Sequence, residues 1–81
     1  MRVKASKNKF RSYLTQHQLL KKFEKQVKIF EDDPRHPSLH TELLEPKPDG
    51  VYSFRIDKKY RVLFILIDDE AEVVGISDHY Q

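Results

Sequence analysis

The spacing of apolar residues along the chain changes once, near Leu39. Between residues 7 and 30 apolar side chains recur at intervals of three and four, which is typical of amphipathic helices. Beyond Leu39 the interval falls to two, which is typical of strands that bury one face. A short alternating segment at 2–6 predicts a first strand. The pattern therefore predicts a strand, a helical segment and then a run of strands.

The helical segment is expected to form two helices, because its apolar residues fall into two groups. Ser6 and Thr15 are candidate N-caps, which puts the break between the helices near residues 14–17. Pro34 is expected to end the second helix because proline lacks a backbone N–H. The two groups are Phe10, Tyr13 and Leu14, then Leu20, Phe23, Val27 and Phe30.

The second half predicts an antiparallel meander of three to four strands, with turn residues between them. One short strand, two helices and this meander make an α+β fold of two layers, in which the helices cover one face of the sheet. A chain of 81 residues without linker or repeat is expected to be a single domain spanning residues 1–81. The expected strands are 40–46, 51–56, 60–67 and 71–80.

Charge is unevenly distributed. Up to Phe30 nine basic residues face one acid, a net charge of +8, and the rest of the chain carries −6. A basic surface attracts polyanions through counterion release, although lysine-rich helices are also simply well solvated. The absence of cysteine and of a long apolar run predicts a cytoplasmic protein without membrane contact.

Arg55 and Arg61 are expected to share the sheet face that points away from the helices. Side chains alternate across a strand, so Tyr52, Phe54 and Ile56 point to the core and Arg55 to the other face. A tight turn at 57–60 then brings Arg61 beside Arg55. Two neighbouring arginines repel each other unless an anion lies between them.

Glutamate, arginine, histidine and tyrosine on one small sheet fit cleavage of RNA without a metal. Such a reaction needs a base for the 2′-hydroxyl, cations for the charge on phosphorus and an acid for the leaving 5′-oxygen. Glu42, the two arginines and His79 supply these groups, and Tyr80 can stack or orient. The four histidines lack the spacing of paired metal ligands, so neither a metal nor another cofactor is expected.

Simpler interpretations exist for each of these residues. Arg55 or Arg61 can pair with Asp57, Glu42 or Asp78, and surface pairs of this kind are common and weak. Glu42 can be an ordinary polar residue on an edge strand. His79 can be a solvated terminal histidine.

Residues 32–80 contain a Pro-x-His-Pro-x-Leu loop, a Gly before a strand with Ser-x-Arg-Ile, a following Tyr-Arg-Val and a closing His-Tyr. With these motifs the segment resembles the RelE/ParE superfamily of bacterial toxins. The order of elements in residues 2–30 fits the same superfamily. The closing His79-Tyr80 is most similar to the YoeB-like branch, whose members cut messenger RNA in the ribosomal A site.

The resemblance implies a role for each matching residue. Glu42 takes the position of the general base, Arg61 of the transition-state arginine, His79 of the general acid and Tyr80 of the residue that orients the scissile phosphate. Arg55 matches a supporting arginine. A basic residue common three positions after the glutamate is Glu45 here, and Lys47 is the expected substitute. The basic helices, with Lys21, Lys22 and Lys25, would dock on ribosomal RNA.

The resemblance also implies partners and leaves alternatives open. It implies a cognate antitoxin, the ribosome and its messenger RNA, and either a homodimer or a toxin–antitoxin hetero-oligomer. A ParE-like inhibitor of DNA gyrase and a catalytically inactive protein-binding module are the alternatives. Glu45 makes the inactive module credible.

Overall fold

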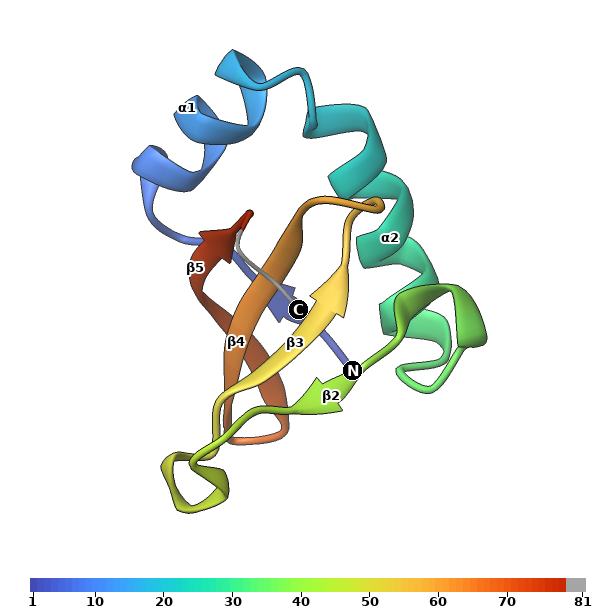
Figure 1. Cartoon of the computed structure of the whole chain (residues 1–81), viewed down its shortest axis with the longest axis vertical. Coiled ribbons are helices and arrows are strands. Elements are labelled where there is room, and N and C mark those ends of the chain that lie inside the picture. The colour runs from blue at the N-terminus through green and yellow to red at the C-terminus, as the bar shows by residue number, and fades with distance from the viewer. Residues whose placement is uncertain (79–81) are drawn as a thin grey trace.

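The computed structural model describes residues 1–78, and its elements follow the predicted order (Figure 1). A strand and two helices come first, followed by four strands. Two short 3₁₀ helices, Pro37–Leu39 and Lys47–Asp49, flank the second strand. In chain order the main elements are β1 (Val3–Lys4), α1 (Asn8–Gln16), α2 (Leu20–Asp32), β2 (Glu42–Leu43), β3 (Tyr52–Arg55), β4 (Arg61–Ile67) and β5 (Glu70–Ser77).

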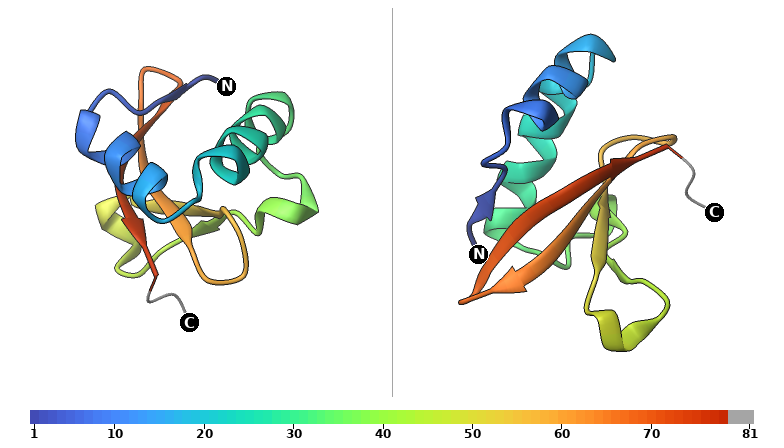
Figure 2. Two further views of the ribbon diagram at one scale, coloured as in Figure 1. Left: turned by 90° about the horizontal axis from the view of Figure 1, so that it is seen from above. Right: turned by 90° about the vertical axis from the view of Figure 1, so that its left-hand side faces the viewer.

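The five strands form one sheet in the order β1-β5-β4-β3-β2. β2, β3, β4 and β5 are antiparallel to their neighbours along the chain, as the meander prediction requires, and β1 lies parallel to β5 at the edge. Both helices lie on the same side of the sheet (Figure 2). The predicted two-layer α+β fold is therefore confirmed. No helix among residues 1–78 has the length and apolar character needed to cross a membrane.

Three phenylalanines form the centre of the core. Phe30 of α2 stacks on Phe54 of β3 with ring centroids 5.0 Å apart, and it makes a T-shaped contact with Phe64 of β4 at a centroid distance of 5.1 Å. All three are at most 2% exposed. Burying one such side chain contributes about 1.5–3 kcal/mol, so this cluster binds the helical layer firmly to the middle of the sheet.

The predicted alternation along β3 is confirmed. Phe54 and Ile56 are buried on the helix side, and Tyr52 packs against the same core. Arg55 lies directly opposite Arg61 of β4. Directly opposite residues of an antiparallel pair share a face, so both arginines are on the face away from the helices.

A β-bulge interrupts the pairing of β4 with β5. Leu63 pairs with Gly75, but the next residue, Phe64, pairs with Val73, so Val74 is the extra residue. Val74 is 41% exposed, whereas Val73 is buried. Before the bulge the odd-numbered residues of β5 therefore point to the helices, and after it the even-numbered residues do.

The two predicted helix caps are wrong. The N-cap positions are Lys7 and Leu19, and neither side chain makes a capping hydrogen bond. Thr15 instead lies in the last turn of α1. The break follows from Gln18, whose φ of 59° is left-handed, and from burial of Leu19 to 2% exposure. Packing of Leu19 thus decides where α2 begins, in place of a local side-chain cap.

The strand predicted at 40–46 is also too long, because β2 comprises only Glu42–Leu43. His40 ends the preceding 3₁₀ helix with a left-handed φ of 45°, so extended backbone begins only after it. Pro46, which has no N–H to donate, precedes the next 3₁₀ helix. Two non-extended segments therefore confine β2 from both sides.

Asp68 and Asp69 form the two-residue turn between β4 and β5. Ile67 and Glu70 are already paired, so the turn is shorter than the three residues predicted. Both aspartates have positive φ, 49° and 64°. Positive φ at both central residues is the requirement of a type I′ hairpin turn, in which asparagine and glycine are favoured.

We expect Asp69→Gly to raise the free energy of unfolding by about 0.5–1 kcal/mol, because glycine adopts a left-handed φ without the steric cost that other residues carry. Urea unfolding followed by circular dichroism measures the change. Lys58→Gly, in the exposed turn before β4, is the matched control and should bring no gain. Equal stabilisation by both substitutions would contradict this account of the turn.

Candidate active site

Polar side chains of four strands share the sheet face opposite the helices. Arg61, the first residue of β4, pairs with Arg55 of β3 on one side and with Ser77 of β5 on the other. Ser53, two residues before Arg55, pairs with Glu42 of β2. Residues two apart on a strand point the same way, so all five belong to one face. β5 ends beside Arg61.

Arg61 is the largest polar side chain that the sheet buries, at 2% exposure. Its Nε donates to the Oγ of Ser53 at 2.9 Å, and its Nη2 donates to the carbonyl oxygen of His40 and, at 3.5 Å, to that of Ser53. A buried guanidinium is tolerated only where acceptors surround it. These bonds fix the guanidinium between β3 and the loop that leads into β2.

The loop before β2 is itself held from the helix side. Gln26 of α2 is 7% exposed, and its Nε2 donates to the carbonyl oxygens of Arg55 at 2.8 Å and Ser38 at 3.4 Å. Leu39 is fully buried in the core. The acceptor on His40 therefore has a defined position relative to β3.

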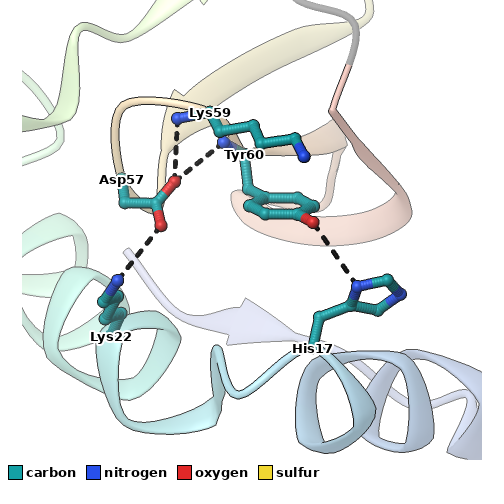
Figure 3. A network of polar contacts seen from close by, with 5 residues as sticks. All are labelled: His17, Lys22, Asp57, Lys59 and Tyr60. Atoms are coloured by element: carbon teal, nitrogen blue, oxygen red, sulfur yellow. Dashed lines mark hydrogen bonds and ion pairs between the residues drawn. The ribbon is translucent and has the colours of Figure 1, made fainter.

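The turn before Arg61 is attached to both helices (Figure 3). The Asp57 carboxylate accepts hydrogen bonds from the backbone N–H groups of Lys59 and Tyr60, each at 2.9 Å, and pairs with Lys22 of α2 at 3.3 Å. The Tyr60 hydroxyl lies 3.4 Å from Nδ1 of His17, at the end of α1. The start of β4 is thus positioned from the helical layer as well as from the sheet.

These contacts change the acidity of Asp57. Partial burial opposes ionisation of the carboxyl group, but the backbone donors of Tyr60 and Lys59 and the ion pair with Lys22 outweigh it. Together they hold the pKa of Asp57 below its ordinary value. Asp57 thus pairs with a helix lysine, which differs from the interpretation that it neutralises one of the arginines.

The end of β5 also lies within electrostatic reach of α1. Burial, Tyr60 and Asp78 together raise the pKa of Tyr13 above its ordinary value. The ring of Tyr13 lies 4.2 Å from that of His17 and 6.3 Å from that of Tyr60, measured between centroids. The last described residue of the chain is therefore close to an aromatic cluster at the end of α1.

The structure brings together part of the predicted site. Glu42, Arg55 and Arg61 share one face, and Glu42 is exposed at its edge. His79 and Tyr80 lie outside the described residues. Their roles stay predictions, and so do those of the other three residues.

The predicted RNA-binding lysines occupy separate surfaces. Lys47 lies on the β2–β3 connection, at the opposite end of β3 from Arg61, so the structure does not bring it beside the guanidinium. Lys21 and Lys25 line a shallow depression on α2, in the layer behind the sheet. Lys22 is engaged by Asp57. Of the predicted RNA-binding residues, Arg55 alone shares the face of Arg61.

Two contributors to the site were not predicted from the sequence. Ser53 is fully buried and binds Arg61, and the alternation of β3 had already put it on the arginine face. The carbonyl of His40 has no sequence signal, because any residue carries that group. Among residues 1–78, no group of three or more histidines and carboxylates is arranged to hold a metal ion.

Solved structures share this architecture over nearly the whole chain. A YoeB/ParE toxin from Agrobacterium tumefaciens superposes with a TM-score of 0.71, 17% identity and coverage of 99% of this chain and 100% of that one. YoeB in a YoeB-YefM complex from Staphylococcus aureus superposes with a TM-score of 0.70 at 21% identity. The match covers 99% of this chain and 98% of that one. This is the fold of the YoeB/ParE toxins.

A third structure with the YoeB/ParE fold, a YoeB dimer from Staphylococcus aureus, gives a TM-score of 0.71 at 20% identity, covering 98% of this chain and 94% of that one. An uncharacterised protein from Haemophilus influenzae is 37% identical over 43 residues. That match spans 53% of this chain and 43% of the Haemophilus protein. No protein-family model matches the sequence. The fold implied by the RelE/ParE resemblance is confirmed.

Ser53→Ala removes the acceptor for the buried Nε of Arg61. We expect the free energy of unfolding to fall by about 1–3 kcal/mol, because a buried donor left without its partner costs its desolvation energy. Chemical denaturation measures the loss. Ser12→Ala, at an exposed position of α1, is the control and should change stability by less than about 0.5 kcal/mol. A loss from Ser53→Ala no larger than that of the control would contradict the role given to Ser53.

Asp57→Asn is expected to reduce stability at pH 7 by about 1 kcal/mol, through weaker hydrogen bonds and loss of the Lys22 ion pair. A carboxyl whose pKa is lower in the folded chain contributes fully above its unfolded pKa of about 3.9, and the contribution disappears as pH falls through the folded-state value. The difference between the variant and the original chain should therefore shrink below about pH 4.

Urea titrations at several pH values measure this difference. Asp49→Asn, at an exposed position beyond β2, is the control for removal of one negative charge. A deficit of Asp57→Asn that is constant from neutral to strongly acidic pH would show that ionisation of Asp57 contributes nothing to stability.

Proposed function

We propose that this chain is the toxin of a type II toxin–antitoxin system and cleaves messenger RNA on the ribosome. The observation that carries the proposal is the common face of Glu42, Arg55 and Arg61 beside the end of β5, on a fold shared with YoeB toxins. The same face would bring His79 and Tyr80 to the RNA. The expected location is the cytoplasm.

The proposed chemistry needs no metal. The Glu42 carboxylate takes the proton of a ribose 2′-hydroxyl, and the 2′-oxygen forms a bond to the adjacent phosphorus while the bond from phosphorus to the 5′-oxygen breaks. His79 protonates the leaving 5′-oxygen. Arg61 and Arg55 stabilise the negative charge that develops on the phosphoryl oxygens. The products are a 2′,3′-cyclic phosphate and a 5′-hydroxyl.

The partners follow from the same proposal. The relatives of known structure include a YoeB-YefM complex and a YoeB dimer, which favours an antitoxin partner and a homodimeric or hetero-oligomeric assembly for this chain. The ribosome would present the messenger RNA. Lys21, Lys25 and Lys28 on α2 form a cationic surface suited to ribosomal RNA.

Glu42→Gln is the first test, because Glu42 is exposed at an edge strand and the substitution keeps the shape of the side chain. Loss of a general base should lower the cleavage rate by about 10²–10⁴-fold. Primer extension on a messenger RNA after induction, together with growth, reports the cut positions and the arrest. Asp68→Asn, in the exposed turn at the end of β4 farthest from Arg61, is the control for loss of one carboxylate and should cleave at the original rate.

Cleavage by Glu42→Gln at the rate of the original chain would overturn the assignment of the base. His79→Ala should show a similar loss with a normal unfolding transition. Arg61→Lys is preferred to Arg61→Ala, since Arg61 is buried and its removal is expected to disturb folding as well as chemistry.

The burial of Arg61 favours a second candidate function. A guanidinium that is 2% exposed and bonded to Ser53 and His40 serves as a structural clamp, which suits a protein-binding module without nuclease activity. A ParE-like inhibitor of DNA gyrase would be such a module. Growth arrest with DNA damage and without RNA cuts would support this candidate, and expression without any growth defect would support an inactive module.

A further inference from the structure

A hollow of about 370 Å³ opens beside Glu42, between the loop before β2 and the first residue of β3. Its size falls in the range of about 300–1,000 Å³ that is usual for small-molecule sites. The Pro-x-His-Pro-x-Leu loop supplies one side of it, which gives that motif a place at the site. The lining residues that matter here are Arg35, His36, Thr41, Glu42, Leu43 and Tyr52.

The hollow has a rigid aromatic wall. Tyr52 is half-buried and stacks on Phe64 of the core, with centroids 5.5 Å apart and planes inclined by 18°. Leu43 of β2, which pairs with Tyr52, adds an apolar surface that is 39% exposed. Flat apolar walls of this kind suit a nucleobase, since stacking on an aromatic side chain is worth about 1–3 kcal/mol per base.

The opposite side of the hollow carries hydrogen-bond donors. Nδ1 of His36 accepts the backbone N–H of Ser38 at 3.1 Å, so the neutral ring carries its proton on Nε2. The Arg35 side chain is exposed beside it, and its backbone N–H is fixed by the Asp33 carboxylate at 3.0 Å. A cation and a ring N–H donor match the acceptor atoms of a base or phosphate.

We propose that this hollow binds the base of the nucleotide immediately 5′ to the cut, the nucleotide whose 2′-hydroxyl attacks. The inference rests on the proposed function, because Glu42 both lines the hollow and acts there as the base for that hydroxyl. Tyr52 points to the helix side of the sheet and Glu42 to the opposite side, so the nucleotide lies across the edge strand β2. Its base stacks on Tyr52, its ribose lies at Glu42, and its 3′-phosphate reaches the face that carries Arg61. Arg35 and His36 then determine which bases are accepted.

Nucleoside 3′-monophosphates mimic the nucleotide in this position, with base, ribose and 3′-phosphate. The test titrates the four 3′-monophosphates into the full ¹⁵N-labelled chain and follows amide chemical shifts. We expect shifts at residues 35–43 and at Tyr52, and tighter binding than that of the 5′-monophosphates, whose phosphate points the wrong way. Arg35→Ala should weaken binding about tenfold, the effect of losing one charge-assisted hydrogen bond.

Arg11→Ala, which removes the same charge from α1, is the matched control and should leave the affinity unchanged. Arg35→Ala keeps the Asp33 turn, because that bond uses the backbone N–H. Shifts confined to the lysines of α2, identical shifts with inorganic phosphate alone, or an equal loss of affinity in Arg11→Ala would each overturn the proposal.

A second experiment separates this inference from the proposed function. Primer extension compares the bases that precede the cuts made by the original chain and by Arg35→Ala. A changed preference at that single position supports the hollow, and an unchanged preference with an unchanged rate overturns it. If the original chain makes no cuts, the proposed function fails, and the titration still decides whether the hollow binds a nucleotide.

Discussion

A guanidinium buried in a small protein must find acceptors within the fold, and Arg61 finds them on two separate segments. Ser53 and His40 bind it, so β3 and the loop before β2 cannot move independently of β4. Gln26 then connects that loop to α2. The position of Glu42, two residues after His40, is therefore a consequence of satisfying a charge on another strand.

β3 and β4 each contribute side chains to the core and to the polar face, because consecutive side chains of a strand point in opposite directions. Phe54 and Phe64 bind the sheet to Phe30 of α2, while Arg55 and Arg61 face away from it. The polar face consequently has a rigid support directly behind it. Under the proposed function, a shallow hollow at an edge strand and a fixed cation would orient a nucleotide without a deep cavity.

The fold followed from the sequence because its signals are local and periodic. Spacings of three, four and two predicted the helices and strands, and alternation predicted that Arg55 and Arg61 share a face. The cap at Thr15 was wrong because burial of Leu19 decided where α2 begins. The cap at Ser6 was wrong by one residue, since α1 has Lys7 at its N-cap. Of the groups that form the site, only the side chains could be predicted from the sequence. The carbonyl of His40 belongs to the backbone, and its direction depends on a left-handed residue that the sequence does not reveal.

The single extra residue Val74 has an effect well beyond its own position. It lets Arg61 face Ser77; uninterrupted pairing from Phe64 and Val73 would set Ile76 there instead. An insertion or deletion of one residue in β5 thus exchanges an aliphatic neighbour of the guanidinium for a hydroxyl-bearing one, without altering any other strand. In evolutionary terms, the residue beside Arg61 can change from polar to apolar through a one-residue change in the length of β5, while the other residues of this face stay the same.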